Sequence, residues 1–275
     1  MRKWIPVALS LGTVVVVMRS LYGPADNWPA ALAAVAAWWV LMGPAAVYGV
    51  PGMPLTTAAL EVLPDDARTN PASDEWARQM TAKFARHGFV ARSRFRLRGD
   101  SHFDFAQRLD NPTTGEVATL MAGWQPTPEE GPAIPVRIFV LITQVEGDGQ
   151  VVTANSPLPS ISPPLPGQRA YRLPEIADAV QLYSIHRRLV KKDGRKAVPI
   201  VLGDDPLAWE RKQHDRSIAL QVSHGLATRD EKAGRLKPTW KGAFRSTWLL
   251  HPFLTAFQNR RATREASAAL RVLPA

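Results

Sequence analysis

Two long apolar stretches open the chain. Residues 4–18 ("WIPVALSLGTVVVVM") and residues 28–50 ("WPAALAAVAAWWVLMGPAAVYGV") contain no charged side chain. A helix rises about 1.5 Å per residue, so about 20 apolar residues cross a bilayer core of about 30 Å. The second stretch is long enough, and the first becomes so if it continues to residue 22 while Arg19 snorkels to the interface. The pattern predicts a transmembrane helical hairpin formed by residues 4–22 and 28–50.

Two other interpretations of these stretches stay open. The first stretch is compatible with a cleaved signal peptide before a single anchor, although residues 22–27 offer no small-x-small cleavage site. Alternatively, residues 28–50 form a buried alanine-rich helix of a soluble domain. Under the hairpin prediction, Arg2 and Lys3 favour a cytoplasmic N-terminus. The chain then returns to the cytoplasm, which predicts a multi-pass protein of the cell inner membrane with a cytoplasmic C-terminal domain.

Helical spacing of apolar residues appears further along the chain. Trp76, Met80 and Phe84 recur every four residues, which places their side chains on one face of a helix. A serine side chain accepts hydrogen bonds from the first free N–H groups of a helix. We therefore expect a helix over residues 74–87 with Ser73 as its cap.

An alternation of apolar and polar residues follows this helix and predicts strands. A nearly continuous apolar run, "VRIFVLITQV", is typical of a central, buried strand. Asp-Gly after this run is a common hairpin turn. The expected strands cover residues 89–97, 102–109, 116–124, 136–145 and 150–154. Together they predict an antiparallel meander of four or five strands.

Helices dominate the pattern of the C-terminal half. A proline at the first turn predicts a helix over residues 174–191, and "DDP" predicts another that starts at residue 204 and ends near residue 224. Residues 227–230 and 235–238 read as the two strands of a small hairpin. Thr239 then caps a last helix.

The predicted fold class is α+β, divided into four parts. Residues 1–50 form the membrane anchor and residues 51–72 a proline-rich linker. Residues 73–156 form the helix and the antiparallel meander. Residues 157–275 form a helical region with the small hairpin and a basic, aromatic C-terminal helix.

Several short motifs accompany this organisation. They are "GF" after the first helix, "DGQVVTAN" in a strand, "SIHRRL" in a helix and "TWKGAF" at the start of the last helix. Their succession over residues 74–261 resembles a set of uncharacterised bacterial membrane-anchored proteins with an α+β domain. The motifs are turn and packing signatures, and no activity is established for such proteins. The resemblance therefore implies a fold and no function.

The small hairpin suggests the wing of a DNA-binding winged helix. Its basic side chains are the candidate phosphate contacts; they are Arg229, Lys232, Arg235 and Lys237. A winged helix, however, places two helices around a turn of about three or four residues before the wing. Here residues 192–203, about a dozen, separate the two helices. A membrane-tethered DNA-binding regulator is therefore the alternative hypothesis and not the first one.

The last helix combines aromatic and basic residues. Trp240, Phe244 and Trp248 recur every four residues. Further candidate contact residues follow them; they are Phe253, Phe257, Arg260, Arg261 and Arg264. Aromatic residues on one face of a basic helix are typical of helices that lie on an anionic membrane surface. This predicts contact with anionic lipid or with a protein partner, whereas under the other interpretation the aromatic residues pack in the core.

The composition offers little for catalysis. The chain has no Cys, which excludes disulfides, thiolate nucleophiles and Cys-ligated metals. No His stands in a metal-ligand spacing and no glycine-rich phosphate loop is present, so we expect no catalytic residue, metal or cofactor. His102 and Asp104 share one face of a strand, which leaves a hydrolase with an unrecognised site as a third hypothesis.

Charge completes the prediction of function. The formal net charge of +10 favours polyanionic partners such as lipid headgroups or nucleic acid. With no catalytic motif, the first hypothesis is a membrane-anchored, non-catalytic interaction or scaffolding protein with a basic domain.

Overall fold

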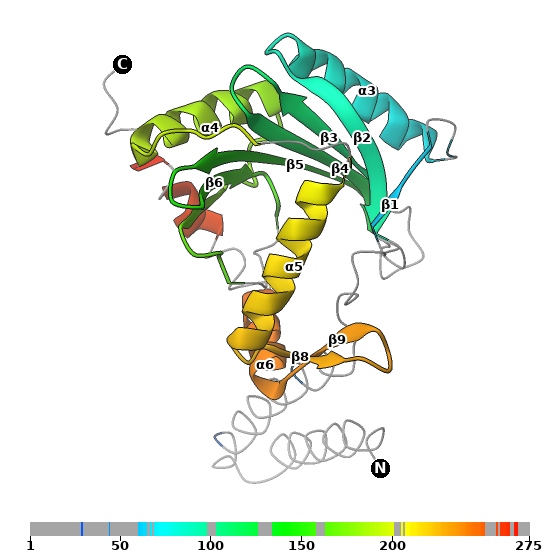
Figure 1. The fold of residues 1–275 in the computed structure, drawn as a ribbon, viewed down its shortest axis with the longest axis vertical. Helices are drawn as coiled ribbons and strands as arrows, with labels where there is room; N and C mark the ends of the chain where they lie inside the picture. Colours follow the sequence, from blue (N-terminus) through cyan, green and yellow to red (C-terminus); the bar gives the residue numbers. More distant parts are fainter. Residues whose placement is uncertain are drawn as a thin grey trace. The chain divides into compact units, whose positions relative to one another are not determined.

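The described residues of this protein form an α+β fold in two compact units (Figure 1). The computed structural model describes residues 60–64, 67, 69–97, 103–125, 134–157, 163–200, 205, 207–250, 257, 259–264 and 267–268, together with Pro29 and Pro44. One unit, called here the sheet unit, contains residues 56–217 and 252–275. The other, called here the hairpin unit, contains residues 218–251 and 1–55.

A mixed sheet of seven strands forms the centre of the sheet unit. Its strands are β1 (Leu60–Val62), β2 (Val90–Leu97), β3 (Phe103–Asn111), β4 (Glu116–Gln125), β5 (Ile134–Val145), β6 (Gly149–Ala154) and β7 (Gln168–Arg172). They lie side by side in sequence order. Neighbours are antiparallel from β1 to β6, while β7 pairs with β6 in parallel.

The turn between β3 and β4 is fixed by its own side chains. The Asn111 Oδ1 atom accepts hydrogen bonds from the backbone N–H groups of Thr113 and Thr114. Gly115 then adopts a φ of 71°, in the left-handed region that glycine enters without a steric penalty. These local contacts set the register in which Asp110 pairs with Val117.

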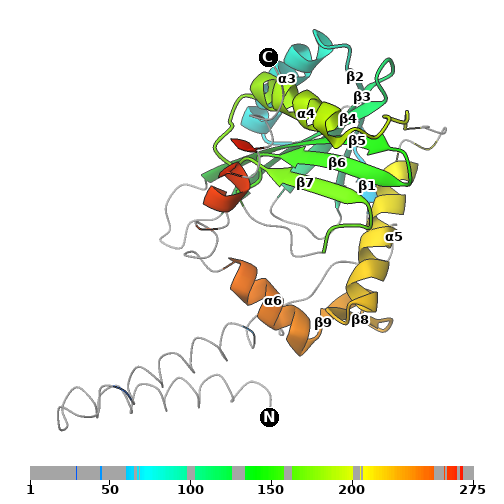
Figure 2. The same ribbon diagram turned by 90° about the vertical axis from the view of Figure 1, so that its left-hand side faces the viewer.

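Two helices cover one face of the sheet (Figure 2). They are α3 (Pro71–Ala85) and α4 (Ala179–Asp193). From α3, Trp76 and Phe84 are buried against strand residues such as Phe139, whose ring centroid lies 5.3 Å from that of Trp76. From α4, Leu182 and Tyr183 join the same core. The apolar stripe of each helix is thereby removed from water, which is the main source of its stability.

A buried histidine links α4 to the centre of the sheet. The two ring nitrogens of His186 lie 2.8 Å from the Thr143 hydroxyl on β5 and 2.9 Å from the Thr153 hydroxyl on β6. Burial lowers the pKa of His186 to about 3, and the charge of Arg187 acts in the same direction. The imidazole is therefore neutral at physiological pH, and its hydrogen bonds identify it as a structural group.

The start of α5 (Ala208–Ser223) packs on the other face of the sheet. Leu207, just before the helix, is fully buried against Phe95 of β2 and Ala106 of β3. Beside this contact, Glu210 of α5 receives two hydrogen bonds of 2.9 Å from the buried Arg108 of β3.

The hairpin unit consists of the end of α5, two strands and one helix among its described residues. The strands are β8 (Ala227–Asp230) and β9 (Arg235–Pro238), and the helix is α6 (Trp240–Leu250). Ile218 of α5, Ala227 and Leu236 form its small apolar core.

The predicted transmembrane hairpin is not supported. Within the described part of the chain, no helix combines the length and the apolar composition needed to cross a membrane, because α3, α4, α5 and α6 have only 15, 15, 16 and 11 residues. The stretches 4–22 and 28–50 lie outside the described residues, apart from Pro29 and Pro44. The fold class is therefore corrected to an α+β fold with a mixed sheet.

Several predicted boundaries also change. The first helix starts at Pro71 and its cap is Asn70, whose side chain accepts a hydrogen bond from the Ala72 N–H. Ser73 lies within that helix and does not cap it. The next helix begins only after Asp178, which caps it, and not at residue 174. Two strands were not expected: β1 lies in the predicted linker, and β7 lies at the start of the region 157–275 that was predicted to be helical apart from the small hairpin.

Candidate functional site

Thr239 fixes the position at which α6 leaves the hairpin. Its hydroxyl accepts a hydrogen bond from the Gly242 N–H at 3.1 Å and donates to the Gly225 carbonyl at 2.7 Å. Its own N–H donates to the Leu226 carbonyl at 3.0 Å. The cap predicted from the sequence is thus confirmed, and it also attaches the start of α6 to the end of α5.

The helix α6 turns its small residues inward. Gly242, Ala243 and Ser246 are buried. A Cβ atom built on Gly242 would lie 1.9 Å from the backbone carbonyl oxygen of Leu226, so the helix rests directly on the backbone of the hairpin unit. Only glycine permits so close an approach.

The large aromatic residues of α6 consequently point away from the unit's core. Trp240, Phe244 and Trp248 are 51%, 40% and 59% exposed. Lys241 and Arg245 are also exposed and flank them. An amphipathic helix ordinarily buries its large apolar side chains, whereas α6 buries small residues and exposes large aromatic ones. We call these five residues the α6 surface.

The four candidate phosphate contacts of the hairpin differ in exposure. Arg229 and Lys232 are exposed, whereas Arg235 and Lys237 are partly buried. Arg235 and Lys237 alternate with the buried Leu236 on β9, so they share the hairpin face opposite to it. The basic side chains are therefore spread over both faces and the tip of the hairpin.

The remaining predicted contact residues are not part of the hairpin unit. Phe257 is 65% exposed, and Arg260, Arg261 and Arg264 are exposed, but all four belong to the sheet unit. Phe253 lies outside the described residues. The structure therefore places Trp240, Phe244 and Trp248 together on one helix, α6.

The contacts of Asp104 do not support the hydrolase hypothesis. Its Oδ2 atom accepts hydrogen bonds from the Ser73 hydroxyl at 2.6 Å and from the Trp124 indole N–H at 3.1 Å. These contacts join α3, β3 and β4, which is a structural role. His102 lies outside the described residues, and the described ones contain no group of three His, Asp or Glu residues placed to hold a metal ion.

A buried charged cluster was not predicted. Arg108 is only 1% exposed; its Nε donates to Asp110 at 2.7 Å and its Nη1 to Glu210 at 2.9 Å. Burial raises the pKa of Glu210, while the neighbouring Arg108 opposes this effect. The sequence signal was the spacing of the charged residues 108 and 110, two apart in a predicted strand region, which puts both on one face.

A second buried carboxylate lies on the opposite face of the sheet. Glu116 accepts hydrogen bonds from the Tyr183 hydroxyl at 2.8 Å and from Arg187 at 3.2 Å. Burial and the hydrogen bond with Glu116 raise the pKa of Tyr183 to about 12. The phenol therefore stays protonated and holds α4 against β4.

Comparison with known proteins gives no relative. No protein-family model matches the chain, and neither a curated protein nor a solved structure matches it significantly. Any functional conclusion therefore depends on the geometry described above.

Proposed function

We propose that this protein is a non-catalytic interaction module that docks on an anionic lipid surface through α6. The observation that carries the proposal is the reversed burial of α6, in which small residues face the core and Trp240, Phe244 and Trp248 face outward. Removing the apolar area of large aromatic side chains from water is favourable. An exposed row of such side chains therefore marks an interaction surface.

Charge supports lipid as the partner. Lys241 and Arg245 flank the aromatic row, and Arg229 and Lys232 are exposed on the adjoining hairpin. Each basic residue near an anionic bilayer contributes about 1 kcal/mol of attraction. Trp and Phe side chains partition into the boundary between headgroups and acyl chains, so the aromatic and basic side chains of α6 favour the same partner.

Vesicle binding tests the proposal. The full-length protein and a Trp240→Ser/Trp248→Ser variant are sedimented with vesicles of phosphatidylcholine, with or without phosphatidylglycerol. We expect the variant to lose at least about tenfold in binding to the anionic vesicles. The matched control is Val62→Ser/Val90→Ser, which removes two exposed apolar side chains of the sheet unit and is expected to bind as the parent protein does.

The same proteins can be used to test duplex DNA as the alternative partner. A DNA-binding regulator would bind duplex DNA with a steep salt dependence that Arg235→Gln/Lys237→Gln weakens. Such binding, together with vesicle binding that Trp240→Ser/Trp248→Ser leaves unchanged, would replace the lipid proposal by the DNA one.

A further inference from the structure

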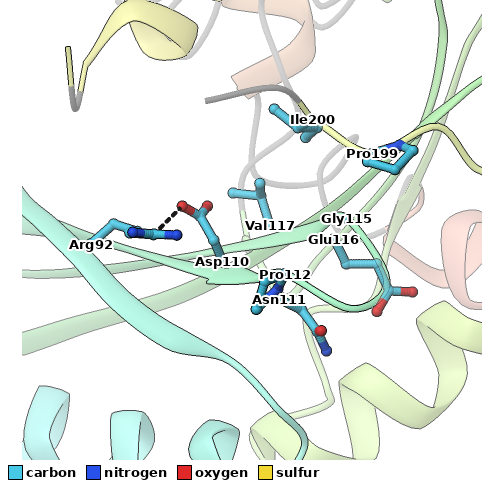
Figure 3. A pocket seen from close by; sticks show the side chains of 9 residues that line it. All are labelled: Arg92, Asp110, Asn111, Pro112, Gly115, Glu116, Val117, Pro199 and Ile200. Carbon is cyan, nitrogen blue, oxygen red and sulfur yellow. Dashed lines mark ion pairs between the residues drawn. The ribbon is translucent and has the colours of Figure 1, made fainter. Parts of the chain in front are cut away.

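A cavity lies at one end of the sheet, on the face opposite to α3 and α4 (Figure 3). Its volume is about 240 Å³, which suits a small molecule. The ends of β2, β3 and β4 form its floor, and the segment after α4 lies over it. That segment is held close: a Cβ on Gly115 would lie 2.4 Å from the Cα of Pro199.

Asp110 is the polar group within this cavity that has hydrogen-bonding capacity left. The residue is 4% exposed, and its Oδ1 accepts a hydrogen bond from Arg108. Its Oδ2 is buried and makes no hydrogen bond within the described part of the chain. It forms an ion pair with the Arg92 Nε, at 3.3 Å. Because this oxygen makes no hydrogen bond, it has lone pairs left to accept one from a ligand.

The other buried polar residues of the lining have their partners. Asn111 donates to the His87 carbonyl, and its Oδ1 accepts the two turn N–H groups. Glu116 is bonded to Thr114, Tyr183 and Arg187, and in Figure 3 its side chain points away from Asp110.

Arg92 supplies a second charged group at the edge of the cavity. Its side chain is 51% exposed, so the ends of its guanidinium reach solvent while its Nε faces Asp110. The rest of the lining includes apolar side chains, which come from Pro112, Val117, Pro199 and Ile200. In Figure 3, Val117 and Ile200 face each other across the space above the Asp110 carboxylate.

We propose that this cavity binds a small aliphatic α-amino acid, with its ammonium group on Asp110 and its carboxylate on Arg92. A carboxylate and a guanidinium side by side favour a zwitterion over a simple cation or anion, because each charge of the ligand meets its opposite. The apolar walls accommodate a branched aliphatic side chain. This site is independent of the proposed lipid contact, since all its residues belong to the sheet unit.

Calorimetric titration of the full-length protein with L-leucine tests this inference. Two molecules that each lack one charged group are titrated in parallel: 4-methylpentanoate, without the amine, and 3-methylbutylamine, without the carboxylate. We expect leucine to bind and each truncated molecule to bind at least about tenfold more weakly, because a buried charged group would be left without its partner.

A pair of matched variants locates the site. Arg92→Gln is expected to weaken leucine binding at least about tenfold. Arg96→Gln is the control, because Arg96 lies on the same strand, is 52% exposed and pairs through its Nε with a carboxylate, Glu61, at the same 3.3 Å. Ile200→Trp, which fills the cavity without removing a charge, is expected to abolish binding.

Three results would overturn the inference. They are no heat of binding for leucine at millimolar concentration, equal binding of leucine and the amine, and equal weakening by Arg92→Gln and Arg96→Gln. The circular dichroism spectrum of each variant shows whether it is folded, and Arg96→Gln and Ile200→Trp leave the buried Asp110–Arg108 pair intact.

Discussion

Gly242 determines which way α6 faces. Its missing side chain lets the helix lie against the Leu226 carbonyl, and the large residues on the other side of the helix are then directed outward. The exposure of Trp240 and Trp248 is thus a consequence of one close backbone contact and not of poor packing.

Gly242→Val therefore tests the packing of this unit. Valine would collide with the Leu226 backbone, and we expect the hairpin unit to lose about 1–3 kcal/mol of stability. Phe244→Val places the same β-branched residue at an exposed position of the same helix and controls for helix propensity. Amide hydrogen exchange over residues 226–250 measures the difference. Equal exchange in the two variants would contradict the packing described here.

His186 makes the stability of the sheet unit depend on pH. Its pKa is about 3 in the folded protein, against 6.5 for an unperturbed imidazole. Below pH 6.5 the His186 imidazole is protonated in the unfolded chain, whereas in the folded protein it stays neutral down to about pH 3. The stabilisation is thus complete above pH 6.5 and is lost as the pH falls from 6.5 toward 3, by at most about 1.4 kcal/mol per pH unit.

His186→Gln is expected to flatten this dependence. Glutamine keeps groups that hydrogen-bond to Thr143 and Thr153 but does not titrate. Denaturant unfolding at pH 7 and pH 4.5 measures the loss of stability in both proteins. The variant should lose less than the parent between the two pH values, and an equal loss would show that other groups cause the acid sensitivity.

Among the elements, those with a strong local pattern were predictable. The signals were the helical spacing of Trp76, Met80 and Phe84, the alternation in β2 to β4, the apolar run of β5 and the Thr239 cap. All of them lie within short windows of sequence. The burial of Trp76, Met80 and Phe84 confirms that their spacing marks the helix face that meets the core.

The missed elements are those that tertiary contacts create. The strand β1 has three residues and β7 has five, and neither carries a long alternating pattern. The strand β7 forms by parallel pairing with β6, a contact that no local turn signals. The start of α3 was misassigned for a different reason, because Asn70 and Ser73 are both good caps and only the Asn70–Pro71 order selects the first.

The candidate site was predictable in part. The aromatic spacing of α6 could be read from the sequence, but its exposure could not, since the same spacing also fits a core helix. The cavity at Asp110 had no local signal: Arg92, Asp110 and Ile200 come together only through strand pairing and the return of the chain after α4.

At the scale of the whole molecule, the positive charge and the exposed aromatic residues point to one kind of partner. The net charge of +10 favours any polyanion, and under our proposal the α6 surface selects lipid among them because Trp and Phe side chains suit a lipid interface. The predicted location at the cell inner membrane and the orientation of the C-terminal domain stay predictions. The central claim is that the α6 surface is where the protein meets lipid.

One fluorescence measurement tests this claim most directly. The chain has no Cys, so Phe244→Cys carries an environment-sensitive fluorophore at a single position on the α6 surface, and Arg78→Cys carries it on the exposed side of α3. On adding phosphatidylglycerol vesicles, we predict a blue shift and an intensity increase at position 244, reversed by salt, and no change at position 78. An unchanged signal at position 244, with the protein bound to the vesicles, would show that α6 is not the contact.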